Sequence, residues 1–231
     1  MPVNEYGQMI GESVVGHASG KLPAIDFLEG RYARIEVLSV EKHADDLLAV
    51  YGPDSPRDMW TYLFQPPVAN LEELMVALKQ MIERKDRFCY AIIDKATGKA
   101  LGTFSLMRID QNNRVIEVGT VIFSPELRGT RIGTEAQYLL ARYVFEELNY
   151  RRYEWKCDAL NLPSRKSAER LGFVYEGTFR QAVIYKGRTR DTDWLSMIDK
   201  DWPQVKARLE TWLAPKNFDK NGQQIKSLRQ C

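Results

Sequence analysis

The fold is decided by residues 115–148, which have the sequence VIEVGTVIFSPELRGTRIGTEAQYLLARYVFEEL. The first nine, VIEVGTVIF, are rich in β-branched residues, with Val and Ile recurring at period two, which predicts a strand. A Ser-Pro pair ends this strand, and a basic, glycine-containing loop follows at residues 128–133. Beyond the loop the apolar residues recur at helical spacing. The order is therefore strand, loop, helix.

The loop at residues 128–133 has the composition of a phosphate-binding loop. A loop that leads into a helix N-terminus presents backbone N–H groups without intrahelical partners, and the helix dipole adds partial positive charge there. Glycines that permit a close turn, hydroxyl donors and positive charges come together at Gly129, Gly133, Thr130, Thr134, Arg128 and Arg131. We expect an anionic ligand; the alternative is an ordinary connection with two solvated arginines. The loop matches neither the nucleoside triphosphate nor the dinucleotide signature.

Two blocks of the chain resemble a known family. RGTRIG at residues 128–133 resembles the R/Q-x-x-G-x-G/A acyl-coenzyme A signature of the GNAT acetyltransferase superfamily, and the TEA after it is similar to that of its RimJ/RimL branch. Arg131 replaces the first glycine of the signature, so an amide must be presented by a residue with a Cβ, or the arginine side chain reaches a phosphate instead. The second block, ALNLPSRKSAERLGF, resembles the Asn161-x-x-Ser164 pattern followed by Gly172-Phe of that branch. The same block also fits the ordinary N-cap and C-cap residues of a short helix.

This resemblance covers about residues 31–200 and implies a fold and an activity. The implied fold class is α/β (α+β): a GNAT fold whose mixed central sheet has about seven strands, with flanking helices and a coenzyme loop after the fourth strand. The implied reaction moves an acetyl group from acetyl-CoA directly to a primary amine, without a metal ion. The residues expected to bind the coenzyme are Val121, Ile122, Phe123, Arg128, Gly129, Thr130, Arg131, Ile132, Gly133, Thr134 and Asn161.

The resemblance also implies a proton donor for the departing thiolate. Many members of the superfamily use a tyrosine four residues before the Gly-Phe pair, and that position is Ala168 here. RimJ/RimL-like enzymes have a serine instead, which this chain matches with Ser164. The alternative is that the Ser164 hydroxyl only bonds backbone amides in the first turn of a helix.

Glu117 is the expected base, because it lies in the strand that leads into the coenzyme loop. Period-two alternation predicts that its side chain shares a face with Gly119, Val121 and Phe123. Burial there would raise the pKa of the carboxyl towards the range useful for a base. The alternative is that the Glu117 carboxylate has only a structural role. The other candidates for the base are Asp191, Asp193 and a water-mediated route.

Length and composition indicate one soluble globular domain. The 231 residues are enough for one sizeable core, and 44% hydrophobic with 28% charged residues is not the composition of a disordered chain. A net charge of only +2 gives no general case for nucleic acid or membrane partners. The chain has no run of 18 apolar residues and no signal peptide pattern, so we expect a cytoplasmic protein. No role is assigned to His17 or His43, and the three cysteines are expected to be reduced thiols.

Three segments are expected: an N-terminal arm (1–30) that wraps the domain or lies over a cleft, the acyltransferase domain (31–200), and a C-terminal helix with a polar, poorly ordered tail (201–231). Helices are predicted at 41–51, after Asn70, between Asn161 and Gly172, and at 202–213. Strands are predicted at 33–39, 88–93, 100–109, 115–123 and 152–158, and in a closing hairpin around Lys186. Because a helix connects them, the strands 115–123 and 152–158 are expected to be parallel.

The expected partners are acetyl-CoA and an amine acceptor, and exposed strand edges are compatible with a homodimer. The acceptor itself is not specified by any motif. Trp60, Tyr62 and Phe64 either pack in the core or line its site. A second hypothesis is a GNAT-fold sensor that binds acyl-CoA without turnover. A third, a nucleic-acid binder, has little support at this net charge.

Overall fold

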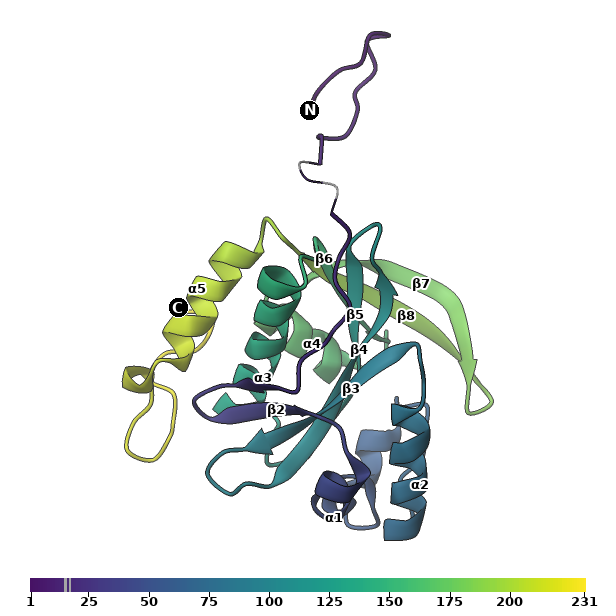
Figure 1. Cartoon of the computed structure of the whole chain (residues 1–231), viewed down its shortest axis with the longest axis vertical. Helices are drawn as coiled ribbons and strands as arrows, with labels where there is room; N and C mark the ends of the chain where they lie inside the picture. The colour runs from purple at the N-terminus through teal and green to yellow at the C-terminus, as the bar shows by residue number, and fades with distance from the viewer. Residues whose placement is uncertain (15, 17) are drawn as a thin grey trace.

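The computed structural model describes residues 1–14, 16 and 18–231, so His17 lies outside the described residues. Within them, eight strands form one mixed sheet in the order β1-β2-β3-β4-β5-β6-β8-β7 (Figure 1). The strands are β1 Phe27–Glu29, β2 Ala33–Val37, β3 Arg87–Asp94, β4 Ala100–Asp110, β5 Val115–Phe123, β6 Arg152–Asp158, β7 Val174–Tyr185 and β8 Arg188–Ile198. The helices are α1 Val40–Tyr51, η1 Arg57–Trp60, α2 Leu71–Ile82, α3 Arg131–Arg142, η2 Tyr143–Glu147, α4 Leu162–Leu171, α5 Trp202–Leu213 and η3 Pro215–Asn217.

The sheet has one strand more than the seven or so that were expected. The additional strand is β1, which pairs antiparallel with β2 and lies within the range 1–30 that was expected to be an arm. Three residues are too few for a period-two pattern to appear, so no sequence pattern marks this strand. The predicted parallel pairing of β5 with β6 is confirmed, and the other neighbouring strands among the described residues pair antiparallel.

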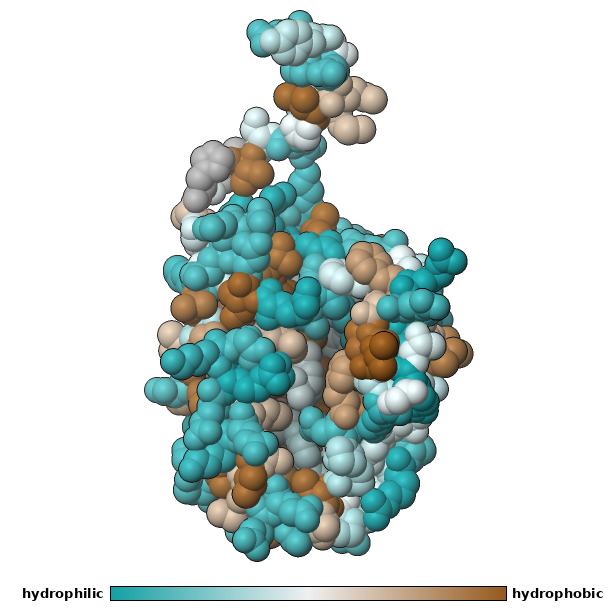
Figure 2. All heavy atoms as spheres, turned by 90° about the vertical axis from the view of Figure 1, so that its right-hand side faces the viewer, coloured by the Kyte–Doolittle hydropathy of each residue, from teal (hydrophilic) through white to brown (hydrophobic). Residues whose placement is uncertain are grey.

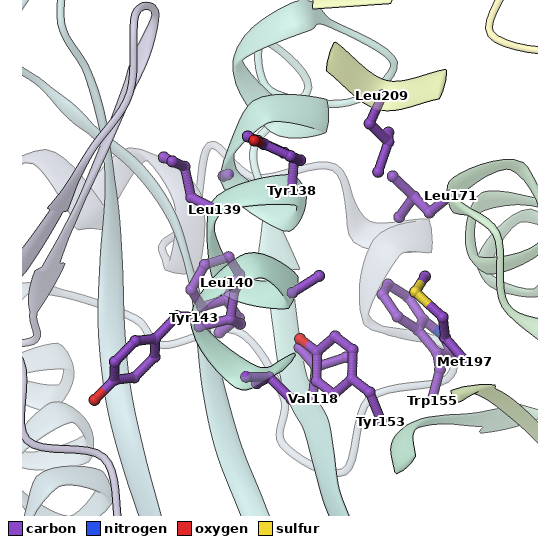
Figure 3. Packing of buried hydrophobic residues seen from close by; sticks show 14 of the residues in the cluster. Val118, Tyr138, Leu139, Leu140, Tyr143, Tyr153, Trp155, Leu171, Met197 and Leu209 are labelled. Carbon is purple, nitrogen blue, oxygen red and sulfur yellow. The ribbon is translucent and has the colours of Figure 1, made fainter. Parts of the chain in front are cut away.

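Two layers of helices cover the two faces of the sheet. Helices α1 and α2 pack on one face, and α3, α4 and α5 pack on the other (Figure 1). The core under α3 to α5 is the larger, and Figure 3 shows Tyr153 and Trp155 of β6 and Met197 of β8 pointing into it. Because side chains alternate along a strand, the neighbouring Glu154 and Lys156 face the α1–α2 side.

Local sequence explains where the helices begin and end. The Asn70 side chain accepts a hydrogen bond from the backbone N–H of Glu73 at 2.9 Å, which confirms the predicted cap of α2. Asn161 caps α4 in the same way. At the other end of α4, Gly172 has φ = +113°, a conformation that residues with a Cβ rarely adopt.

A bulge in β5 interrupts the alternation on which one prediction depended. Thr120 has φ = +52°, and Thr120 and Val121 together oppose the single residue Phe104 of β4. After the bulge, Val121 and Phe123 pack on the α3 side, while Ile122 is buried on the α1–α2 side with Glu117. The prediction that Glu117 shares a face with Val121 and Phe123 is therefore wrong.

The parallel strands β5 and β6 separate after the bulge. They are paired only from Val115 to Val118 of β5 with Arg152 to Trp155 of β6. The last five residues of β5 still pair with β4, but no strand among the described residues pairs with their other edge. The sheet therefore has an opening between β5 and β6, directly before the loop that leads to α3.

The N-terminal arm and the C-terminal tail are arranged differently from the prediction. Residues 1–11 stand clear of the body instead of wrapping it (Figures 1 and 2), and the carboxylate of Glu12 is ion-paired with Lys200. Residues 20–24 do lie along the body, since the backbone N–H of Gly20 bonds to the carbonyl of Gln111. The C-terminal tail was expected to be poorly ordered, but it folds back on α5: Leu228 is buried, and Trp212 Nε1 donates to Gln224 Oε1 at 2.9 Å.

Candidate active site

Thr130 starts α3 inside the stretch that was predicted to be a loop. Its Oγ1 accepts a hydrogen bond from the N–H of Gly133 at 3.3 Å and donates one to the carbonyl of Leu127 at 2.9 Å. The helix consequently begins at Arg131, and Arg128 and Gly129 belong to the turn at residues 125–129 that precedes the capping residue. The basic motif is thus half loop and half first helical turn.

Three backbone amides of this motif are available to bind an anion. Among the described residues, the N–H groups of Gly129, Arg131 and Ile132 have no hydrogen-bond acceptor. Gly129 has φ = +70°, the left-handed conformation that favours glycine. A Cβ on Gly133 would overlap the carbonyl oxygen of Leu127, so the tight turn depends on that glycine. Unpaired amides at a helix N-terminus are a general means of binding phosphate.

The side chains of the motif are used differently from the expectation. The hydroxyl of Thr134 donates to the carbonyl of Thr130 at 2.9 Å and accepts from Arg170 at 3.1 Å, so it is engaged within the protein. Arg128 is exposed, and its Nε donates to the carbonyl of Phe123 at 3.2 Å. Arg170 lies beside the first turn of α3, and sequence reasoning missed it because it comes from α4.

Arg131, the residue in place of the signature glycine, packs against aromatic rings. Its guanidinium carbon lies 4.4 Å from the centroid of Tyr32 and 5.5 Å from that of Phe218. Tyr32 lies between β1 and β2, and Phe218 belongs to the tail. The arginine therefore connects two segments that are far apart in the sequence at the start of α3.

Glu135 fixes the start of α3 to the sheet. Its buried carboxylate accepts hydrogen bonds from the backbone N–H groups of Arg31 at 3.0 Å, Tyr32 at 2.6 Å and Ala33 at 2.7 Å. These amides form the turn between β1 and β2. The glutamate of the TEA motif thus acts as an anion held by a backbone concavity, a role that no sequence pattern indicated.

The second motif places Asn161 and Ser164 at the start of α4. The side chain of Asn161 accepts from the N–H of Ser164 at 3.2 Å, and Oγ of Ser164 accepts from the indole Nε1 of Trp155 at 3.1 Å. Cys157 is next to this serine, and burial raises the pKa of its thiol to about 11, with a hydrogen bond to Ser164 opposing the shift. Such a thiol is a poor nucleophile.

Glu117 is buried on the α1–α2 face of β5, with 6% of its surface exposed. Burial raises the pKa of its carboxyl above the ordinary value, although Lys156 and Arg108 oppose this rise. The Nζ of Lys156 donates to Oε2 of Glu117 at 2.6 Å, and Nε of Arg108 lies 3.3 Å from the same oxygen. The carboxylate is therefore dry and close to the opening in the sheet, but paired with two cations.

The alternative carboxylates occupy other places. Asp193 is buried under α4, where it accepts from Thr178 at 2.5 Å and from Arg165 at 3.3 Å. Asp191 accepts the backbone N–H of Gln181 at 2.7 Å and stabilises the bulge of the closing hairpin. Like Glu117, both carboxylates have partners within the protein. Glu117 differs in its place, because it lies in the strand that borders the opening.

A match to a family of proteins accounts for this arrangement. Residues 34–174, more than half of the chain, match the family model described as "Acetyltransferase (GNAT) domain". The chain belongs to the GNAT acetyltransferase family. It is an acetyltransferase of the kind that uses acetyl-CoA, and the unpaired amides at the start of α3 suit the phosphates of that substrate.

Three GNAT relatives show how far the likeness extends. The crystal structure of a GCN5-related N-acetyltransferase from Brucella melitensis superposes with a TM-score of 0.89 and 44% identity, covering 92% of this chain and 96% of that one. YdaF of Bacillus subtilis (strain 168), provisionally named a ribosomal N-acetyltransferase, is 35% identical over 105 residues, which are 46% of this chain and 57% of that protein. The spermidine N(1)-acetyltransferase of Escherichia coli (strain K12) is 25% identical over 147 residues, 64% of this chain and 77% of that one.

Two segments that are far apart in the sequence, the closing hairpin and residues 60–64, contact each other. Lys186 in the turn of the closing hairpin donates to the carbonyl of Trp60 at 2.8 Å, and the rings of Phe64 and Tyr185 lie 5.5 Å apart. Trp60 is buried and packs in the core, whereas Phe64 is 61% exposed. Within the described residues, no cluster of side chains could hold a metal ion, and no helix has the length and apolar character needed to span a bilayer.

Proposed function

We propose that this GNAT enzyme is a RimJ/RimL-like N-acetyltransferase that transfers the acetyl group of acetyl-CoA directly to a primary amine of a small molecule or a protein N-terminus. The observation that carries the proposal is the opening between β5 and β6, which has unpaired strand edge on one side and the three unpaired amides of the coenzyme loop at its end. A thioester can lie in such an opening with its phosphates at the loop.

In this proposal the coenzyme loop binds and orients the acetyl donor. The amides of Gly129, Arg131 and Ile132 hold the pyrophosphate, and Arg128 adds an exposed positive charge beside them. The main chain of Val121 to Phe123 borders the opening, where an N–H group can polarise the thioester oxygen. Asn161 flanks the pantetheine arm from the start of α4, and Thr130 and Thr134 hold the shape of the loop.

The acceptor amine attacks the thioester carbon from the α1–α2 side of the sheet. Its nitrogen forms the new C–N bond, and its surplus proton passes to Glu117, directly or through one water. The C–S bond breaks, and Ser164 gives its hydroxyl proton to the departing thiolate before solvent restores it. No covalent enzyme intermediate is needed.

The relatives indicate two broad classes of acceptor. One relative acts on spermidine and another is named for ribosomal acetylation, so both polyamines and protein N-termini are candidate acceptors. A cytoplasmic location and a homodimer stay predictions from the sequence. The second candidate function is an acyl-CoA sensor without turnover, which the replacement of a signature glycine by Arg131 favours.

Two measurements test the proposal. Calorimetric titration with acetyl-CoA should give saturable binding below millimolar concentration, and its absence would refute both the enzyme and the sensor. Release of free thiol should then be followed with spermidine, with a short peptide that has a free N-terminus, and with the same peptide N-acetylated as the control. Binding without amine-dependent thiol release would identify a sensor.

A further inference from the structure

A row of charged side chains lies on the α1–α2 face beside the opening, and the proposed mechanism uses only one of them. Lys156 of β6 lies between two carboxylates: its Nζ donates to Oε2 of Glu117 at 2.6 Å and to Oε2 of Glu154 at 2.8 Å. All three side chains are buried, with 8% or 9% of their surface exposed. The ammonium group is therefore held in place from two sides.

An aromatic ring holds the same ammonium from a third side. Nζ of Lys156 lies 3.7 Å from the centroid of Trp194, its partner across the β6–β8 ladder. Phe179 stacks on that indole with a centroid separation of 4.6 Å. A desolvated ammonium is attracted to the face of an indole ring, so the position of Lys156 is well defined.

The other charges that face Glu117 do not replace Lys156. Arg108 of β4 approaches at 3.3 Å, but its side chain is 59% exposed and its charge is screened by water. Arg87 of β3, which bonds to Thr120 on this face, is paired with Asp86.

Beyond Lys156, the charged side chains of this row pair with one another. Glu154 accepts from Arg152 as well at 2.7 Å, and Arg152 in turn bonds to Glu176 of β7. Glu154 therefore keeps a cationic partner of its own. Lys156 is the one buried cation in direct contact with Glu117 among the described residues.

We propose that Lys156 is a positioning residue: it is the fixed counter-ion that keeps the Glu117 carboxylate ionised and in place beside the opening, ready to accept the proton of the acceptor ammonium. This inference rests on the proposed acetyl transfer. A buried carboxyl without a counter-ion is favoured in its protonated form, which cannot act as a base. When Glu117 takes up a proton, Lys156 keeps Glu154 as its partner, so no buried charge is left uncompensated.

The test compares the pH dependence of kcat/KM for wild type, Lys156→Met and Lys156→Arg with acetyl-CoA and a reactive amine. Removing an adjacent opposite charge raises a carboxyl pKa by about 1 to 3 units. In Lys156→Met the acid limb should therefore move to higher pH by at least about one unit, with activity recovering towards wild type at the alkaline end. Lys156→Arg keeps the charge and should keep the acid limb near that of wild type. Affinity for CoA should be unchanged in both.

Several results would overturn this inference. One is an acid limb at the wild-type pH in folded Lys156→Met, and another is an equal loss of activity at every pH in both variants, which would indicate packing alone. If Lys156→Met does not fold, Lys156→Met combined with Glu154→Gln removes one of the two carboxylates left behind, and the same upward movement is expected. A wild-type protein that binds acetyl-CoA but releases no thiol refutes the proposed function itself, a result distinct from an unmoved acid limb.

Discussion

The indole Nε1 of Trp155 donates a hydrogen bond of 3.1 Å to Oγ of Ser164. An indole nitrogen can only donate, so the serine oxygen must be the acceptor. The hydroxyl proton of Ser164 is therefore not used in this contact and can point elsewhere. β6 and the first turn of α4 are thus joined in a way that leaves the serine with a proton to give.

Ser164→Ala tests this reading of the serine. If its hydroxyl protonates the departing thiolate, it acts only as the C–S bond breaks, so kcat should fall with little change in affinity for acetyl-CoA. General acid catalysis contributes on the order of 10²- to 10⁴-fold, so we expect a loss of at least tenfold even if water substitutes in part. Steady-state kinetics and calorimetric titration measure the two quantities.

Trp155→Phe is the matched control for that variant, because it removes the same hydrogen bond and keeps the hydroxyl. Losing the bond should lower the melting temperature in both variants, since it contributes about 0.5 to 1.5 kcal/mol. Only Ser164→Ala should lose turnover. Equal kcat values in the two variants would remove the serine from the chemistry and leave it a structural role.

Gly133→Ala should disable the coenzyme loop. The added Cβ would overlap the carbonyl oxygen of Leu127, which is backbone and cannot move aside without opening the turn. We expect the affinity for CoA to fall by at least tenfold, together with a lower melting temperature. Gly129→Ala serves as comparison: its Cβ would meet no atom within 4 Å, so only the strain of its positive φ is added, roughly 1 to 2 kcal/mol. A Gly133→Ala protein with wild-type affinity would contradict this view of the turn.

Local patterns in the sequence were enough to predict most elements. The span of β5 and the closing hairpin around Lys186 were predicted correctly because alternation and glycine-containing turns mark them. The cap at Asn70 was found in the same way. Thr130 is also a good capping residue. The loop was nevertheless predicted to extend to Gly133, so the predicted start of the helix was too late.

Contacts between distant residues could not be predicted. The bulge at Thr120 turns one part of β5 over with respect to the other, and its signal in the VIEVGTVIF sequence is the isolated Gly119 beside it, which the period-two prediction did not take into account. The pair between Glu117 and Lys156 joins residues 39 positions apart, and only the sheet register brings them together. The motifs thus indicated the coenzyme side of the site, while the acceptor side depends on tertiary structure.

Arg131→Ala asks whether the arginine touches a phosphate in the complex. Its position at the first residue of α3, next to unpaired amides, leads us to expect CoA binding weaker by about 1.5 to 3 kcal/mol, the size of a charge-assisted hydrogen bond. Arg131→Met keeps the packing on Tyr32 and Phe218 but not the charge, so it should show the same loss with a smaller drop in melting temperature. Titration with dephospho-CoA tells which phosphate is involved. Unchanged affinity in both variants would make the arginine a packing residue only.

Glu135→Ala should loosen the start of α3 from the sheet. The carboxylate satisfies three backbone N–H groups, those of Arg31, Tyr32 and Ala33, and its loss would leave these donors unpaired in a partly buried turn. An unsatisfied buried donor costs about 1 to 3 kcal/mol, and because the three share one carboxylate we expect a total of roughly 2 to 4 kcal/mol.

Glu135→Gln is the graded control for this variant. The amide retains one acceptor oxygen but lacks the charge, so its loss of stability should lie between those of wild type and Glu135→Ala. Denaturant unfolding gives the free energies, and CoA titration should show weaker binding in the same order, because the helix that carries the coenzyme amides is held by this contact. If Glu135→Ala unfolds at the wild-type denaturant concentration and binds CoA normally, the carboxylate does not anchor α3.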